Sequence, residues 1–323
     1  MRIARLLARL AFSVGLLVMS HESAHAQASG AAFAETLPPG SNYDKAEFKL
    51  WLPAGVTQVR AVAVLVPGSN GDGRGQVDDP VWQAFATSLR LALVGVRLTD
   101  KPHEQSFIEH YVNVSQGSGQ ALLDVLATFA RTSQHPELAH APLLLWGMSA
   151  GGEFNYEFAN WKPERVLGFV VNKGGIYYTA LASAAARRVP ALLFVGGRDL
   201  DSRVQTITGL FALNRRGAAL WALVNEPSAG HVVGRSREMA LRFYEDLLDS
   251  RLPESTGDTS APRVLRPLTE GDGIVGDPKT HETWKAGERT LPNYPTAWLP
   301  SERLAHMWRA IETDQPFAGE AAR

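Results

Sequence analysis

A serine lies in a glycine-rich turn near the middle of the chain, in a pattern that supports nucleophilic catalysis. Residues 146–152 read Trp-Gly-Met-Ser-Ala-Gly-Gly and directly follow the apolar run 143–145. This order predicts a strand, a sharp turn with Ser149 at its apex, and a helix, the G-x-S-x-G arrangement that exposes a serine hydroxyl. Side chains at positions 147 and 151 would crowd such a turn, so we expect Gly147 and Gly151 to be sterically required.

A serine nucleophile requires a base, and a group that orients the base. Asp199 follows the strand-like run 191–195, and His231 follows the later run 219–224, each in a loop. We predict that His231 is the base and Asp199 its orienting acid, with Asp201 as the rival acid. The plainer alternatives are a helix N-cap for Asp199 and a solvated loop histidine for His231.

Attack on a carbonyl places negative charge on its oxygen, which backbone N–H groups can stabilise. One N–H is expected from Ala150, the residue after the serine. The second is expected from the loop 67–71, after the strand-like run 62–66. Pro67 has no N–H, so we favour that of Ser69, with Asn70 second; the alternative is a flexible loop without this role.

Strand-like and helix-like patterns alternate regularly from about residue 48 to residue 248. This alternation predicts an α/β fold, a doubly wound, mostly parallel sheet with helices on both faces. Sites in such sheets lie at the carboxyl ends of the strands, where the predicted triad falls. The interval 173–190 leaves room for a loop and one helix but not for a large cap domain, so we expect an open site.

The chain resembles the α/β-hydrolases over residues 48–248, through the serine turn followed in order by acid and histidine. Its serine turn, its 67–71 loop and its secretory start are also similar to extracellular esterases of the polyhydroxyalkanoate-depolymerase and feruloyl-esterase type. The resemblance implies a secreted serine esterase that works through an acyl-enzyme and acts on a small or polymeric ester. The alternatives are a serine peptidase or amidase of the same fold, and a non-catalytic binding protein.

Composition excludes several other classes of function. The 323 residues carry a net charge of −1, which gives no electrostatic basis for binding nucleic acid or an anionic membrane. The chain has no cysteine, so thiolate metal sites are excluded. Asp72, Asp78 and Asp79 do not match a calcium loop, and the histidines lack metal-ligand spacing. We therefore expect neither a metal nor a cofactor.

The first 26 residues have the form of a secretory signal peptide. Three arginines precede the apolar run 10–19, and Ala-His-Ala at 24–26 matches a cleavage pattern. We predict cleavage after Ala26 and export to the periplasm or medium, with no stable membrane anchor; the alternative is an uncleaved anchor. Residues 27–250 are expected to form the catalytic domain, in which 28–44 form a loose N-terminus.

The last part of the chain, residues 251–323, is rich in proline, glycine and charge and has no clear periodicity. Trp284, Trp298 and Trp308 are spread through it, and such rings are costly to leave in water. We therefore expect this extension to pack on the catalytic domain; the alternative is a separate carbohydrate-binding role. Within the catalytic domain, Asn70, Lys173 and Tyr177 are expected to line the cleft.

Overall fold

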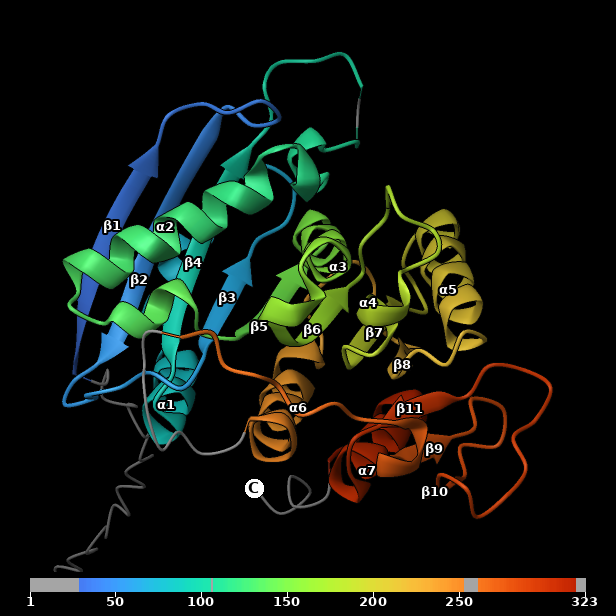
Figure 1. Cartoon of the computed structure of the whole chain (residues 1–323). Coiled ribbons are helices and arrows are strands. Elements are labelled where there is room, and N and C mark those ends of the chain that lie inside the picture. The colour runs from blue at the N-terminus through green and yellow to red at the C-terminus, as the bar shows by residue number, and fades with distance from the viewer. Residues whose placement is uncertain (1–28, 106, 253–260, 318–323) are drawn as a thin grey trace, which may run out of the picture.

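The computed structural model describes residues 29–105, 107–252 and 261–317, in which a twisted eight-stranded sheet is covered by helices on both faces (Figure 1). The strand order is β1-β2-β4-β3-β5-β6-β7-β8, and β3 to β8 run parallel. The strands are β1 (Gly30–Leu37), β2 (Lys45–Pro53), β3 (Val62–Val66), β4 (Ala92–Thr99), β5 (Leu143–Met148), β6 (Val166–Asn172), β7 (Ala191–Gly196) and β8 (Trp221–Glu226). The predicted doubly wound α/β sheet is confirmed.

The inner strands are apolar along their whole length because helices cover both of their faces. Every residue of β3, β6 and β7 is buried. The edge strand β1 instead alternates between exposed and half-buried residues from Ala32 onward, and it pairs antiparallel with β2 from Gly30–Pro53 to Leu37–Ala46. The expectation of a loose segment over residues 28–44 is therefore wrong from Gly30 to Leu37, where pairing with β2 satisfies the backbone.

The helices divide between the two faces of the sheet. One face packs against α1 and α6, and the other against α2, α3, α4 and α5. Their bounds are α1 (Pro80–Leu89), α2 (Ser118–Thr132), α3 (Ala150–Trp161), α4 (Ala184–Arg187), α5 (Asp201–Arg215) and α6 (Ser236–Arg251). Between β6 and β7 the only helix is the single turn α4, so no large cap domain is inserted there.

Residues 261–317 share the core of the larger domain. They form a three-stranded sheet of β9 (Ile274–Gly276), β10 (Thr283–Lys285) and β11 (Ala297–Leu299), followed by α7 (Glu302–Glu312). Trp298 and Trp308 are fully buried, and the Trp308 indole N–H donates a hydrogen bond to the carbonyl of Leu223 in β8, at 2.8 Å. Figure 1 shows this unit, in orange and red, beside β8 and α6.

Residues 1–28, which include the predicted signal peptide, lie outside the described part of the chain. Within residues 29–105, 107–252 and 261–317, no helix combines the length and the apolar character needed to cross a bilayer.

Candidate active site

Ser149 occupies the sharp turn between β5 and α3. Its backbone has φ 54° and ψ −125°, a combination that is costly for a residue with a Cβ. The turn is held by a hydrogen bond from the Ser149 N–H to the carbonyl of Asn172, at 2.8 Å. Ser149 is half-buried at the carboxyl end of β5.

The glycines around Ser149 allow the backbone of three elements to meet. A Cβ on Gly147 would lie 2.2 Å from the carbonyl oxygen of Gly151. A Cβ on Gly151 would lie 2.2 Å from the carbonyl oxygen of Val66, at the end of β3. Both distances are far shorter than any non-bonded contact, so the predicted steric requirement for glycine is confirmed at both positions.

His231 and Asp199 meet above the carboxyl ends of β8 and β7. His231 Nδ1 lies 2.9 Å from Asp199 Oδ2, which leaves Nε2 free to act as a base. Asp199 Oδ1 accepts the Leu200 N–H at 2.8 Å and contacts the Arg203 guanidinium. The Asp199 side chain is only 2% exposed, whereas that of His231 is 36% exposed. The carboxylate is therefore held rigidly, and the imidazole reaches solvent.

The surroundings of Asp199 keep it ionised. Burial raises the pKa of this carboxyl, but the hydrogen bonds from His231 and the Leu200 N–H, together with the charges of His231 and Arg203, lower it by more, so the pKa lies below its usual value. Asp201, the rival acid, is exposed and is the first residue of α5. Of the two carboxylates, the structure places only Asp199 against the histidine.

Ser149 and His231 share the same edge of the sheet but are not hydrogen-bonded. In the part of the chain that the structure describes, no hydrogen bond joins Ser149 Oγ to the imidazole. The structure therefore places an oriented histidine and a half-buried serine at the carboxyl ends of parallel strands of one sheet.

The 67–71 loop lies directly against the serine turn. A Cβ on Gly68 would be 3.5 Å from the Cβ of Ser149. Ala150 is the first residue of α3, so its N–H has no partner within the helix. The Asn70 N–H donates to the hydroxyl of Tyr111 at 3.2 Å, whereas the Ser69 N–H makes no hydrogen bond to any described residue. Of the two N–H groups that the sequence offered, that of Ser69 is the free one.

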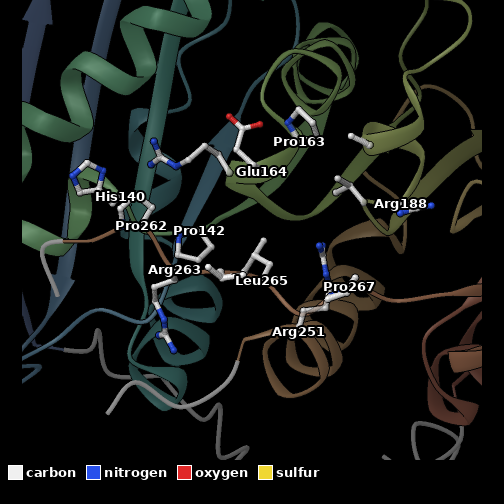
Figure 2. Close-up of a pocket in the computed structure, with 14 residues that line it drawn as sticks. His140, Pro142, Pro163, Glu164, Arg188, Arg251, Pro262, Arg263, Leu265 and Pro267 are labelled. Carbon is white, nitrogen blue, oxygen red and sulfur yellow. The ribbon is translucent and has the colours of Figure 1, made fainter. Parts of the chain in front are cut away.

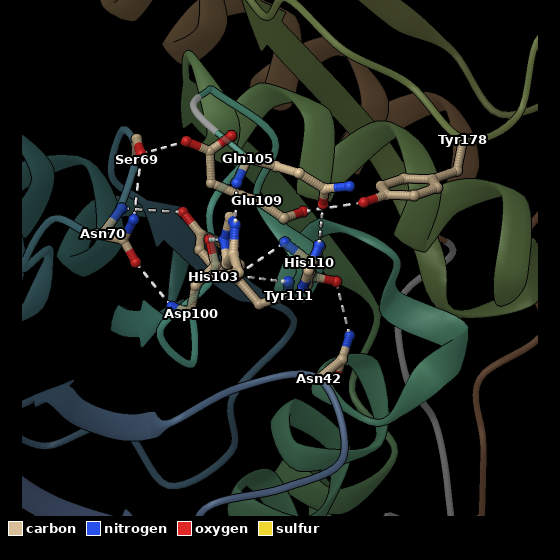
Figure 3. A network of polar contacts seen from close by, with 10 residues as sticks. All are labelled: Asn42, Ser69, Asn70, Asp100, His103, Gln105, Glu109, His110, Tyr111 and Tyr178. Atoms are coloured by element: carbon tan, nitrogen blue, oxygen red, sulfur yellow. Dashed lines mark hydrogen bonds and ion pairs between the residues drawn. The ribbon is translucent and has the colours of Figure 1, made fainter.

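A polar network from residues 100–111 holds this loop (Figure 3). Ser69 Oγ is hydrogen-bonded to the carboxylate of Glu109, and Asn70 Oδ1 accepts the Asp100 N–H at 2.7 Å. Asp100 Oδ1 in turn accepts the His110 N–H at 2.7 Å. These supports were not predicted from the sequence, because they lie about 30 to 40 residues away from the loop, in a stretch without periodicity.

Two of the three residues expected to line the cleft do not present polar groups to it. Lys173 is fully buried, and its ammonium group is paired with Glu226. The Tyr177 hydroxyl is buried without a hydrogen-bond partner among the described residues, and burial raises its pKa well above the usual value. Asn70 is exposed, but it does not line the cavity beside the serine turn. The expectation for Lys173 is wrong because its ammonium group pairs inside the protein with Glu226, which lies 53 residues away in sequence.

Two cavities lie at opposite ends of the parallel strands, and one of them adjoins the serine turn. One of about 720 Å³ is flanked by Gly68 and Met148, on either side of the serine turn. Trp82, Trp146 and Val233 also line it, so it lies beside the serine turn and next to α1, although Ser149 itself is not among its lining residues. The other, of about 520 Å³, is shown in Figure 2 and lies near the amino ends of β5 and β6, at the opposite edge of the sheet; none of the predicted site residues line it.

No group of three or more histidine, aspartate or glutamate side chains among residues 29–105, 107–252 and 261–317 is placed to hold a metal ion. The polar groups near the carboxyl ends of β3, β5 and β8 include the Ser149 hydroxyl, the His231 imidazole and the backbone N–H groups of the serine turn and the 67–71 loop.

The strand order, the serine turn between β5 and α3, and the acid and histidine after β7 and β8 together constitute the α/β-hydrolase fold. No protein-family model and no curated protein sequence matches this chain.

Solved structures that are similar to this chain align with it over most of their own length. A poly(3-hydroxybutyrate) depolymerase from Bordetella parapertussis aligns at 18% identity and a TM-score of 0.49, over 71% of this chain and 92% of its own. A fluorophosphonate-binding serine hydrolase of Staphylococcus aureus aligns at 11% and 0.47, over 68% and 98%. A ferulic acid esterase aligns at 13% and 0.47, over 68% and 96%. Identities this low do not transfer a reaction.

Proposed function

We propose that this protein is a secreted serine hydrolase that cleaves carboxylic esters through an acyl-enzyme. The contact between His231 Nδ1 and Asp199 Oδ2 carries the proposal, since it orients an imidazole at the same end of the sheet as the strained turn of Ser149. A binding protein with this fold has no need of a strained serine, a buried carboxylate and an oriented histidine together.

In the proposed reaction, Ser149 Oγ attacks the ester carbonyl carbon while His231 Nε2 takes the hydroxyl proton. The N–H groups of Ala150 and Ser69 stabilise the resulting oxyanion. The bond to the alkoxide oxygen then breaks, the imidazolium protonates that oxygen, and the alcohol leaves while the acyl group stays on Ser149. A water molecule, deprotonated by His231, attacks the acyl carbon; the imidazolium returns the proton to Ser149 Oγ as the carboxylic acid leaves.

The surroundings of the site favour bulky or polymeric esters. The interval between β6 and β7 contributes only the short helix α4, so no inserted domain covers the serine. Leu200, Val232 and Tyr178 are exposed in the loops that follow β7, β8 and β6. Apolar side chains exposed around a reactive group offer contact area to a large apolar substrate.

A direct test uses the purified mature protein with p-nitrophenyl esters of short and long acyl chains, feruloyl esters and polyester films. A fluorophosphonate probe, followed by peptide mapping, identifies the nucleophile. We expect turnover of esters and covalent labelling at Ser149. Labelling at another serine, or a protein that the probe does not label, would contradict the proposal.

A peptidase or amidase of the same fold is the second candidate, because the same triad serves both reactions. Parallel assays with p-nitroanilides separate the two. Hydrolysis of anilides at rates similar to those of the matched esters would favour the amidase.

A further inference from the structure

A buried ion pair crosses the sheet edge between the proposed nucleophile and base. The Lys173 ammonium contacts the carboxylate of Glu226 and donates to Asn172 Oδ1 at 3.0 Å. Lys173 follows β6 and Glu226 ends β8, with β7 between them. A Cβ on Gly196, the last residue of β7, would lie 3.0 Å from Lys173 Cε. The lysine side chain therefore passes over the end of β7.

Residues 227–235 form the loop that carries His231. Hydrogen bonds join the C-terminal end of this loop to Glu226 of the ion pair and to the neighbouring Asn172. Glu226 Oε1 accepts the Arg235 N–H at 2.7 Å, and the Asn172 side-chain amide donates to the Val233 carbonyl at 3.0 Å. Gly234 has φ 58°, and a Cβ there would lie 2.4 Å from Glu226 Oε1. The loop thus folds tightly around the carboxylate.

The same group of residues also reaches the serine turn. The Asn172 carbonyl accepts the Ser149 N–H at 2.8 Å, while the Asn172 side chain bonds to Lys173 and to the His231 loop. One residue at the end of β6 therefore contacts both the turn of the proposed nucleophile and the loop of the proposed base.

Stability alone is a poor explanation for this arrangement. Lys173 is 0% exposed, and removing two charges from water is costly, so a buried ion pair is often no more stable than apolar residues of the same volume. Lys173 also has φ 57°, which is unfavourable for a residue with a Cβ. Costs of this kind are typical of residues that hold a functional geometry.

We propose that Lys173 and Glu226 are positioning residues, which hold the 227–235 loop so that His231 stays aligned with Ser149. This inference rests on the proposed function and adds residues that touch neither the substrate nor the reacting atoms.

The primary variant is Glu226→Gln, which keeps an oxygen acceptor for the Arg235 N–H but leaves Lys173 without its charge partner. We expect kcat on p-nitrophenyl esters to fall about 10- to 100-fold with little change in KM, and labelling of Ser149 by the fluorophosphonate to slow in parallel. A second variant, Lys173→Met/Glu226→Gln, leaves no unpaired buried charge. Because it lacks the unpaired charge, this double variant is expected to fold even if the single variant is unstable. We expect the same loss of kcat.

The matched control is Glu270→Gln, which breaks the ion pair between Arg215 and Glu270 away from the His231 loop. All variants are assayed well below their melting temperatures. We expect this control to have a lower melting temperature than the wild type and an unchanged kcat. If the two Glu226 variants kept kcat within about twofold of the wild type, the positioning role would be excluded.

Hydrogen exchange of residues 227–235 tests the inference independently of activity. We expect faster exchange of this loop in the two Glu226 variants but not in Glu270→Gln, and equal exchange in all of them would overturn the inference. Failure of the proposed function looks different. In that case the wild type neither hydrolyses esters nor is labelled at Ser149.

Discussion

His231 Nδ1 lies 2.9 Å from Asp199 Oδ2, although 32 residues separate the two in sequence. The sheet explains the contact, because β7 and β8 are parallel neighbours in which Gly196 pairs with Glu226. The loops after these two residues leave the same edge side by side. The Arg198 N–H donates to the carbonyl of Ala229 at 2.9 Å and ties one loop to the other.

This contact predicts unequal effects at two neighbouring aspartates. Asp199→Asn is expected to lower kcat by roughly 10²- to 10⁴-fold, because the amide no longer fixes the imidazole tautomer. Asp201→Asn is the matched control, since Asp201 is exposed, and it should change kcat by less than about threefold. The measurement is steady-state kinetics on one ester. A larger effect at Asp201 would assign it the orienting role.

Ser149→Ala is expected to lower kcat by about 10³-fold or more, since only the oxyanion N–H groups and substrate binding remain to accelerate the reaction. The variant should fold normally, and replacing the side chain leaves the backbone hydrogen bond to Asn172 in place. Circular dichroism checks the fold. A variant that is folded and retains more than a tenth of the activity would rule out Ser149 as the nucleophile.

Glu312 predicts a pH dependence of stability. Burial raises the pKa of this carboxyl to about 7, although it accepts the Asn225 N–H at 2.6 Å. The folded protein therefore holds a proton between pH 4.5 and 7 that the unfolded chain releases, so this group's contribution to the free energy of unfolding falls as pH rises through that range.

The comparison is Glu312→Gln, which keeps the acceptor oxygen but does not titrate. We expect the two melting temperatures to be similar near pH 5 and the variant to melt at the higher temperature near pH 8. Glu153, whose pKa burial also raises to about 7, is present in both proteins, so the difference reports Glu312 together with its pairing to His281, whose Nε2 lies 4.0 Å from Glu312 Oε2. A difference that stays constant from pH 5 to pH 8 would refute the assignment.

The C-terminal unit is expected to stabilise the hydrolase core. Trp308→Ala removes a fully buried ring and leaves the Leu223 carbonyl without its donor. We expect a loss of about 3–5 kcal/mol in the free energy of unfolding, measured by chemical denaturation. Val264→Ala, at an exposed position of the same unit, is the control and should change stability by less than about 0.5 kcal/mol. Equal effects of the two substitutions would mean that the C-terminal unit contributes little to the free energy of unfolding.

Export predicts a new N-terminus. If residues 1–26 are a signal peptide, sequencing of the protein from the periplasm or medium should begin at Gln27. Full-length protein found in the cytosol would contradict this prediction.

The sequence by itself determined the features that depend on short-range rules. Strand-length apolar runs, helical patterns between them and the Gly-x-Ser-x-Gly turn all act within a few residues, so alternation predicted the parallel sheet. Parallel strands place their carboxyl ends at one edge, and the order of serine, acid and histidine along the chain therefore predicted where Ser149, Asp199 and His231 would lie.

Only the tertiary structure decided what depends on partners far away in sequence. Pairing with β2 makes a strand of residues 30–37, whose own pattern is weak. Lys173 is buried rather than exposed in a cleft because Glu226 reaches it from the end of β8. The sequence favoured Asp199 over Asp201 as the partner of His231, and the tertiary structure buries the Asp199 carboxylate between His231 and Arg203. Burial and charge pairing are properties of the packed chain, and no local pattern encodes them.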